Sequence, residues 1–266
     1  MGQVQLGPAF LLAMAGLGAL LLDRRLRNFR TVGWTCAFAF FILLVLKGKP
    51  YYIGPVYPTL FAAGGVMIES IRNARAANAA RIASVALVSA YGIALLPMGL
   101  PLLPQEQMAR YSVAIGATSA LRTNEGELDR LPQDYADMLG WKEQVAAVAV
   151  VYNSLSPSDR RRAVVIAGNY GEAGAIDFYA PAFGLPNAIS AAGTYWFFGP
   201  GKLPGDIAVT VGVPENELRQ FFGDVKLVRR VTHEWAVPEE RDVPIHIASR
   251  PLMTLQQIWP RLTGRN

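Results

Sequence analysis

Two short segments hold the side chains best suited to chemistry, and the first of them begins at Lys47. It reads Lys-Gly-Lys-Pro-Tyr-Tyr-Ile-Gly-Pro-Val-Tyr-Pro, so two ammonium groups stand beside three phenols where glycine and proline prevent a regular helix. Lysine is a compact cation that suits phosphate, and tyrosine is favoured at the headgroup level of membranes. The segment predicts a site for an anionic lipid headgroup such as a polyprenyl phosphate; an interfacial turn with snorkelling lysines is the alternative. The candidate residues are Lys47, Lys49, Tyr51, Tyr52 and Tyr57.

The second segment is a glycine-rich turn, Gly-Asn-Tyr-Gly-Glu-Ala-Gly, which runs from Gly168 to Gly174 after an apolar run. Such a turn between a strand and a helix can hold a phosphate. Its spacing is GxxGxxG, however, and no acid closes a second strand about twenty residues later, so a tight strand-to-helix turn is favoured over a nucleotide site. Because ligands bind at the carboxyl ends of strands in open α/β sheets, Asn169, Tyr170 and Glu172 are the best small-molecule candidates.

An aromatic stretch, Gly-Thr-Tyr-Trp-Phe-Phe-Gly-Pro, contains Tyr195 and Trp196 as further candidates for contact with a small molecule or an acceptor. It is consistent with domain core, with a surface on which a sugar stacks, or with an edge that rests on a membrane. The chain contains no DxD, HExxH, GxSxG or GxxxxGK[ST] motif. Two histidines and one cysteine argue against a metal site and exclude an internal disulfide. The sequence therefore predicts no catalytic residue, metal or cofactor within this chain.

The charges divide the chain near residue 103. Residues 1–103 carry nine Lys or Arg and two acids, whereas residues 104–266 carry sixteen and eighteen. The basic residues of the first part lie in gaps between apolar runs, so they indicate membrane-flanking loops and not a nucleic-acid partner. The apolar runs predict a membrane α-helical bundle of four transmembrane helices, of which the middle two are short for a bilayer core of ~30 Å. They cover about 4–22, 31–46, 53–68 and 82–103.

Arginines cluster in two of these gaps, with four between residues 23 and 30 and three between residues 69 and 81. The positive-inside rule places both gaps in the cytoplasm, and it places the Lys47 segment and residues 104–266 outside. The first apolar run has no positive charge before it, so it reads as a retained helix and not as a signal peptide. A helix that enters from outside suggests that the chain is the later part of something longer.

Residues 104–266 alternate between strand and helix patterns, which predicts a small α/β domain with a largely parallel sheet. Continuous apolar runs or alternation predict strands over 162–168, 205–213, 225–232 and 244–249. Helices are expected over 138–154, from 169 to about 183, over 215–222 and over 253–262.

Two stretches also resemble a known family. The segment that begins at Lys47, together with the apolar helix after it, is similar to a late loop of GT-C class membrane glycosyltransferases of the protein mannosyltransferase and aminoarabinose transferase type. Residues 167–179, Ala-Gly-Asn-Tyr-Gly-Glu-Ala-Gly-Ala-Ile-Asp-Phe-Tyr, with the later Tyr195-Trp196, resemble the C-terminal extracytoplasmic domain of bacterial members. The likeness covers the chain from about residue 5 onward.

The resemblance implies an enzyme of the bacterial cytoplasmic membrane that transfers a sugar from a polyprenyl-phosphate donor to a lipid or protein acceptor on the outer face. It also implies that the Lys47 segment lies near the carrier phosphate. The catalytic acids of the family lie in an earlier outer loop without a counterpart here, because Asp23 and Glu69 are expected in the cytoplasm. We therefore expect a C-terminal portion that is inactive alone, with the N-terminal half as a partner if the gene is split. The alternative is a non-catalytic membrane-anchored binding or scaffold protein with an extracytoplasmic ligand-binding α/β domain.

Overall fold

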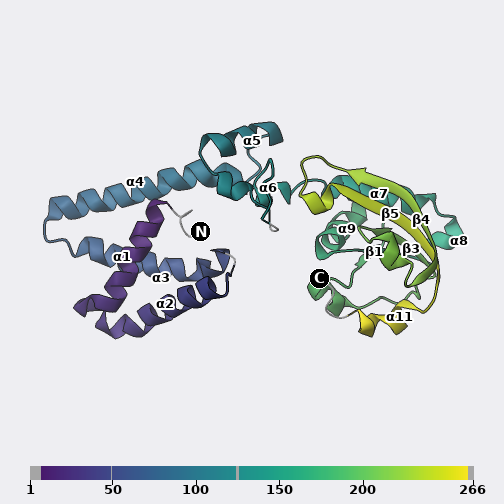
Figure 1. Ribbon diagram of the computed structural model, residues 1–266, viewed down its shortest axis with the longest axis horizontal. Coiled ribbons are helices and arrows are strands. Elements are labelled where there is room, and N and C mark those ends of the chain that lie inside the picture. The colour runs from purple at the N-terminus through teal and green to yellow at the C-terminus, as the bar shows by residue number, and fades with distance from the viewer. Residues whose placement is uncertain (1–6, 49, 124–125, 263–266) are drawn as a thin grey trace. The chain divides into compact units, whose positions relative to one another are not determined.

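The computed structural model describes residues 7–48, 50–123 and 126–262 and forms two compact units, Met1–Leu100 and Pro101–Asn266 (Figure 1). The first unit is entirely helical. It consists of α1 (Pro8–Leu22), the 3-10 helix η2 (Arg24–Phe29), α2 (Arg30–Val45), the 3-10 helix η3 (Pro50–Val56), α3 (Tyr57–Glu69) and α4 (Ala74–Gly99).

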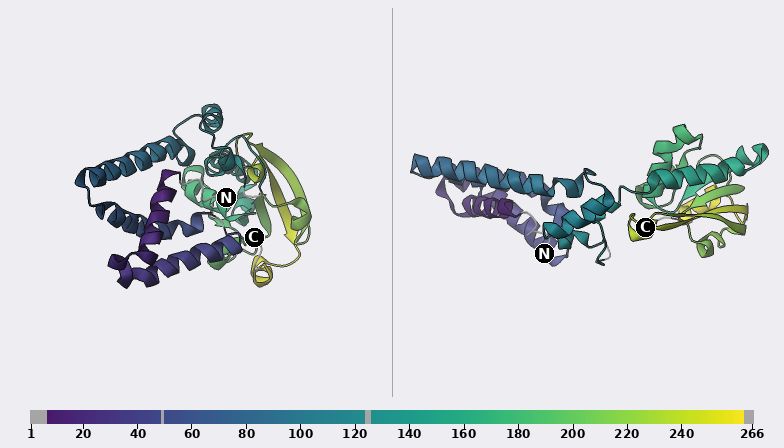
Figure 2. Two further views of the ribbon diagram at one scale, coloured as in Figure 1. Left: turned by 60° about the vertical axis from the view of Figure 1, so that its left-hand side comes forward. Right: turned by 90° about the horizontal axis from the view of Figure 1, so that it is seen from above.

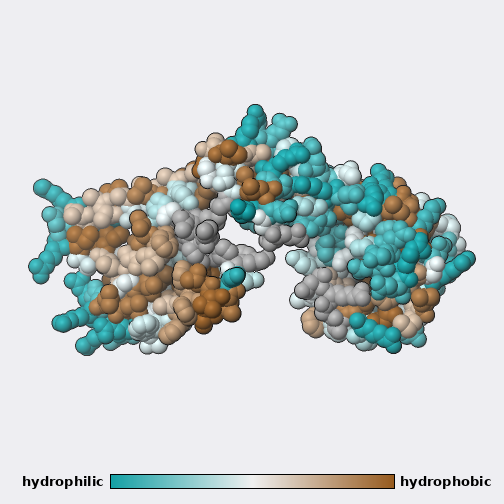
Figure 3. Space-filling view, in the orientation of Figure 1, coloured by the Kyte–Doolittle hydropathy of each residue, from teal (hydrophilic) through white to brown (hydrophobic). Residues whose placement is uncertain are grey.

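Helices α2, α3 and α4 run back and forth, so η2 and the connection from α3 to α4 lie at the same end of the unit (Figure 1). Asp23 caps η2 by accepting a hydrogen bond from the backbone N–H of Arg25 at 2.8 Å. An ion pair between Arg81 and Glu69, with 3.7 Å between nitrogen and oxygen, links the other two helices at this end. Figure 3 shows hydrophilic side chains gathered here and apolar side chains along the helices. The arginine-rich gaps of the sequence therefore share one end of the helical unit.

The helices expose much of their apolar surface, including Leu11, Phe38, Phe41, Leu44 and Ile93. Helix α1 crosses α3 closely, because a Cβ on Gly16 would lie 1.8 Å from the carbonyl oxygen of Leu60. Contact through small residues is typical of helices that pack in a bilayer. The unit thus lacks the polar surface that a helical bundle in water would require.

The sequence predicted four membrane spans, but only two helices within the described residues are long and apolar enough to cross a membrane, Arg24–Val45 and Ala74–Gly99. Helix α1 is apolar but has 15 residues, and α3 has 13. At ~1.5 Å per residue both are shorter than a bilayer core of ~30 Å. The third run is shortened because its first residues, up to Val56, form the 3-10 helix η3, which contains Pro55.

The second unit holds a five-stranded sheet with the order β2-β1-β3-β5-β4. The strands are β1 (Ala163–Ala167), β2 (Ala188–Ile189), β3 (Ile207–Val211), β4 (Phe222–Thr232) and β5 (Asp242–Pro251). The helices are α5 (Gln105–Ala114), α6 (Gln133–Ala136), α7 (Trp141–Ser154), α8 (Pro157–Arg160), α9 (Tyr170–Phe183), α10 (Glu215–Leu218) and α11 (Leu255–Ile258). The 3-10 helices are η4 (Thr118–Leu121), η5 (Gly193–Phe198), η6 (Pro238–Glu240) and η7 (Trp259–Arg261).

The predicted strands are present, but the prediction of a largely parallel sheet is wrong for half of it. Strand β1 pairs in parallel with β2 and β3, whereas β5 is antiparallel to both β3 and β4. A parallel pair needs a crossover of about a dozen residues or more, and the loop between β4 and β5 is too short for one. The helix predicted over 215–222 is also wrong at its end, because α10 stops at Leu218 and β4 begins at Phe222.

The two faces of the sheet are covered differently. Helices α7 and α9 cover one face, where Val145, Val148 and Ile176 pack on β1 and β3 (Figure 2). The other face is covered by short elements, α10, α11 and η7, with Trp259 and Leu218 among the packed residues. Because these elements are short, they leave a cavity over that face near the carboxyl ends of β1 and β3.

Candidate functional site

The glycine-rich turn connects β1 to α9, and Asn169 is the residue that caps the helix. The Asn169 side-chain oxygen accepts a hydrogen bond from the backbone N–H of Glu172 at 2.9 Å. In return, the Glu172 carboxylate accepts from the N–H groups of Gly168 at 2.8 Å and Asn169 at 3.1 Å. This reciprocal capping box satisfies N–H groups that the start of a helix leaves unpaired. The sequence Asn-x-x-Glu at the end of an apolar run encodes the turn locally.

This turn has no room for a phosphate, because the Glu172 carboxylate occupies the position that an anion would take. Two of the N–H groups that could bind an anion already donate to it. Its other oxygen lies so close to Gly212 that a Cβ there would be 1.8 Å away. Gly212 also has a φ of 69°, a conformation that glycine adopts readily. The geometry therefore favours a structural turn over a nucleotide site.

Glu172 belongs to a buried polar cluster that the sequence analysis identified only in part. Asn169 donates from its amide to Glu240 at 2.8 Å, and Gln144 donates to the other oxygen of Glu240 at 2.8 Å. Gln144, Glu172 and Glu240 are all buried, and Glu172 is 3% exposed. Burial, followed by the nearby charge of Glu240, raises the pKa of Glu172 to about 8, although its two backbone N–H partners act in the opposite direction. Glu172 therefore keeps its proton at neutral pH, which avoids two buried negative charges.

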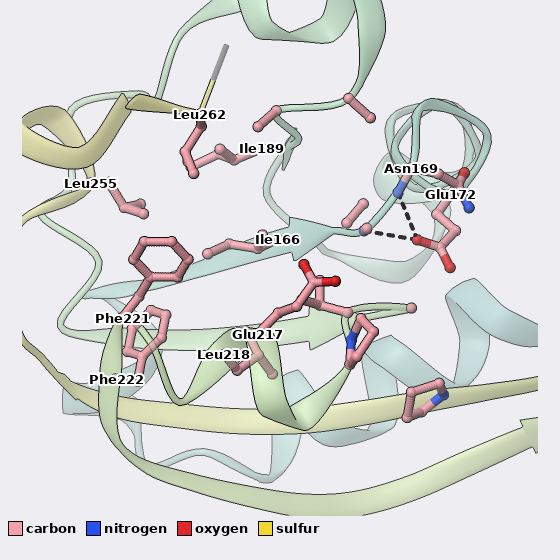
Figure 4. Close-up of a pocket in the computed structure, with 18 of the residues that line it drawn as sticks. Ile166, Asn169, Glu172, Ile189, Glu217, Leu218, Phe221, Phe222, Leu255 and Leu262 are labelled. Carbon is pink, nitrogen blue, oxygen red and sulfur yellow. Dashed lines mark hydrogen bonds between the residues drawn. The ribbon is translucent and has the colours of Figure 1, made fainter. Parts of the chain in front are cut away.

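The cavity beside this cluster has a volume of about 370 Å³ and lies at the carboxyl ends of β1 and β3. Its wall is largely apolar, and Figure 4 shows Ile166, Phe221 and Leu255 around it. Glu172 lies at one side, and the Glu217 carboxylate points into the cavity (Figure 4). No lysine or arginine lines it among the described residues. Such a cavity suits an apolar ligand that is neutral or cationic and disfavours a free phosphate.

The other α/β candidates, Tyr170, Tyr195 and Trp196, do not line this cavity. Tyr170 is exposed on the first turn of α9. The Tyr195 hydroxyl donates to Asp177 at 3.0 Å, and burial together with Asp177 raises its pKa. The Trp196 indole donates to the carbonyl of Trp259 at 3.1 Å, and the Trp259 indole donates back at the same distance. Trp196 thus has a structural role, and Tyr195 fixes η5 to α9.

In the helical unit, Lys47 ends α2 with unusual backbone geometry. Its N–H donates to the carbonyl of Leu44 at 3.3 Å, and the N–H of Gly48 donates to Leu43 at 2.8 Å. These two bonds define a Schellman motif, in which the position of Lys47 is usually glycine. Lys47 is exposed and has a φ of 52°. A side chain in this region costs roughly 1–2 kcal/mol, so lysine here is a local strain.

The other candidates of this loop are only partly described. Tyr52 is exposed in η3, and Tyr57 begins α3 with its ring stacked on Phe61 at 5.8 Å between centroids. Lys49 lies outside the described residues, as does the side chain of Tyr51. Only Lys47, Tyr52 and Tyr57 of the predicted cluster have described side chains, so the cluster as a whole remains a prediction.

Comparisons of this chain with known protein families, with curated proteins and with solved structures find no match. Among the described residues, no group of three or more His, Cys, Asp or Glu is placed to hold a metal ion. The chain therefore has two candidate sites, the segment of residues 47–58, which we call the Lys47 loop, and the acid-lined cavity beside Glu172.

Proposed function

We propose that this chain is part of an integral-membrane glycosyltransferase that uses a polyprenyl-phosphate sugar, and that the Lys47 loop binds the carrier phosphate at the outer membrane face. The observation that carries the proposal is the separation of charge between the two ends of the helical unit. The arginines of η2 lie at one end with the start of α4, whereas Lys47 and η3 lie at the other, where α4 ends at Gly99 (Figure 1). If arginines mark the cytoplasmic side, the lysine loop and the exit toward the α/β unit share the outer side.

The backbone of Lys47 gives a second argument. A glycine at this position would remove strain of roughly 1–2 kcal/mol, and the following residue, Gly48, shows that small residues are compatible with the loop. A strained residue that persists is a reason to suspect function. The loop exposes both Lys47 and Tyr52 at the end of an apolar unit, and an exposed ammonium matches the chemistry of a lipid phosphate.

Sugar transfer needs a general base, and the helical unit offers none near this loop. Its only acids, Asp23 and Glu69, are engaged at the arginine end, where Asp23 caps η2 and Glu69 pairs with Arg81. A base must come within hydrogen-bonding reach of the proton that it removes. We therefore assign binding of the donor to this chain, and expect purified chain to bind a polyprenyl phosphate without transferring sugar.

The test compares Lys47→Gly and Lys47→Ala with the unmodified chain in lipid nanodiscs. A charge-assisted contact is worth about 1.5–3 kcal/mol, so either change should weaken polyprenyl phosphate binding by about 10- to 100-fold. Thermal stability should be unchanged or higher for Lys47→Gly, because the strain is released. Arg27→Gly, at the other end, is the matched control and should leave binding unchanged. An equal, small loss for polyprenyl phosphate and phosphatidylglycerol would reduce the loop to an interfacial turn.

The acid-lined cavity favours a second candidate function, that of a membrane-anchored protein whose α/β unit binds a small apolar ligand. Calorimetric titration with phenethylamine, phenethyl alcohol and hydrocinnamate tests it, because the three probes share a ring and differ in charge. The amine and the alcohol should bind, and the carboxylate should not, because Glu217 and Glu239 line the cavity and no described lysine or arginine does. Ala191→Trp, which fills the cavity, controls for partition into lipid. Equal signals in both proteins would exclude this function.

A further inference from the structure

The 3-10 helix η5 holds two of its residues inward and presents two outward. Tyr195 is fixed to Asp177 of α9, and Trp196 exchanges a pair of hydrogen bonds with Trp259. Phe197 and Phe198 follow directly and are 77% and 80% exposed. The exposure of these rings does not result from a loosely held segment, because Tyr195 and Trp196 are hydrogen-bonded and fix the direction of Phe197 and Phe198. We call the exposed pair and its support, residues 195–202, the Phe197 loop.

The charge of this segment is one-sided. Between Ser190 and Gly205 the sequence contains one charged residue, Lys202, and no acid. Lys202 is exposed and lines the same hollow as Phe198; Asp177 also lines this hollow, but its carboxylate accepts hydrogen bonds from Tyr195 and from the N–H of Ala188. Two adjacent, strongly exposed aromatic rings form an apolar patch of the size that is often functional. The surface instead fits an environment that has an apolar interior and an anionic boundary.

We propose that the Phe197 loop is a membrane-contact surface, which inserts Phe197 and Phe198 into the headgroup region of an anionic bilayer. The inference rests on the proposed membrane attachment of the chain. Phenylalanine is among the residues that interfacial amphipathic segments bury ~5–10 Å deep, at the boundary between the headgroups and the acyl chains. Lys202 would meet lipid phosphates there, with an attraction of about 1 kcal/mol. The function of the loop is to hold the α/β unit against the lipid from which a lipid-linked substrate is taken.

The size of the surface favours a bilayer over a protein partner. An aromatic side chain buries about 150–250 Å² when it is fully covered, so the two rings supply roughly 300–500 Å². A stable protein interface needs about 800 Å² from each partner, usually with several hydrogen bonds. Lipid insertion requires neither a large area nor a matched set of polar partners.

The experiment places single cysteines, labelled with an environment-sensitive fluorophore, in the full chain with Cys36→Ala, reconstituted in nanodiscs of phosphatidylcholine and phosphatidylglycerol. The test positions are Phe197→Cys and Phe198→Cys. Val150→Cys on α7 is the matched aqueous control, because Val150 is also an exposed apolar residue of the α/β unit. Phe41→Cys on the exposed surface of α2 reports whether the helical unit is in lipid.

Lipids that carry a nitroxide near the headgroup should quench the label at both test positions at least about twofold more than at Val150, consistent with shallow insertion. Lipids with the nitroxide at the chain end should quench it less. A blue-shifted label without quenching would mean contact with protein, and a water-like label would mean a free surface; either overturns the inference. Loss of quenching at Phe41 would instead refute the membrane attachment itself, so the two failures are distinct.

Discussion

Replacing Glu172 by glutamine should make the stability of the α/β unit less dependent on pH. A carboxyl whose pKa is raised in the folded state holds a proton that the unfolded chain has already lost. The free energy of unfolding therefore falls as the pH rises from the ordinary pKa of 4.5 toward about 8. Because Glu172 is 3% exposed, solvent screens this effect little. Glutamine keeps the shape of the side chain and an oxygen for the N–H groups of Gly168 and Asn169, but it has no proton to lose.

The expected magnitude follows from 1.36 kcal/mol per pKa unit. Between about pH 5 and pH 9 the unmodified chain should lose roughly 4 kcal/mol through Glu172, and the substitution Glu172→Gln should remove that loss. The relevant quantity is the change with pH in the stability difference between the two proteins. A constant packing cost of the amide cancels from this quantity, so only the titration remains.

Urea unfolding followed by tryptophan fluorescence measures this quantity if Trp34→Phe is the background. The other four of the five tryptophans lie beyond residue 104, so the signal then reports the α/β unit alone. Glu143→Gln, which removes an exposed carboxylate on α7, is the matched control for the chemical change itself. A stability difference that stays constant within about 1 kcal/mol across this pH range would refute the reasoning, since Glu172 would then ionise as it does in the unfolded chain.

Two further substitutions test the packing around strand β3 by the same urea-unfolding assay. Gly212→Ala should lower the free energy of unfolding by at least about 3 kcal/mol, because Gly212 has a positive φ and because the new Cβ would collide with Glu172. When Glu172→Ala is also present, this loss should fall to about 1–2 kcal/mol. Equal losses in both backgrounds would mean that the collision is absent. Thr210→Val should leave stability unchanged or raise it by up to about 1 kcal/mol, because the buried Thr210 hydroxyl has no hydrogen-bond partner within the described part of the chain; a loss of more than about 1 kcal/mol would indicate an unseen partner.

The sequence was sufficient wherever the signal was local. The apolar run of β1 and the Asn-x-x-Glu cap of α9 lie next to each other, so composition alone indicates a strand, a turn and a helix start at these positions. The arginine clusters similarly mark one end of the helical unit without any knowledge of packing.

The rest depends on contacts between distant residues. Gln144 and Glu240 are 96 positions apart, and nothing near either residue marks them as partners. Gln144 is the one amide among the buried residues of α7, and its place beside apolar residues is the only hint of a buried acceptor. The antiparallel half of the sheet was missed for a similar reason, since strand direction follows from which edges meet and not from the strands' own composition. Two of the four predicted spans form helices shorter than a bilayer core, and for the third run the reason is that apolar composition does not reveal where a helix gives way to the 3-10 helix η3.

The structure adds physical reasons to the two predictions about phosphate that were made from the sequence. The sequence favoured a structural turn at residues 168–174, and there the N–H groups of Gly168 and Asn169 donate to Glu172, while no basic side chain lines the neighbouring cavity among the described residues. The sequence predicted a lipid-phosphate site at the Lys47 loop, with an interfacial turn as the alternative, and there an exposed lysine occupies a position where glycine would be less strained. An anion would be repelled at the first site and attracted at the second. We therefore propose that a lipid phosphate binds at the helical unit, and that the α/β unit binds an apolar, uncharged or cationic group.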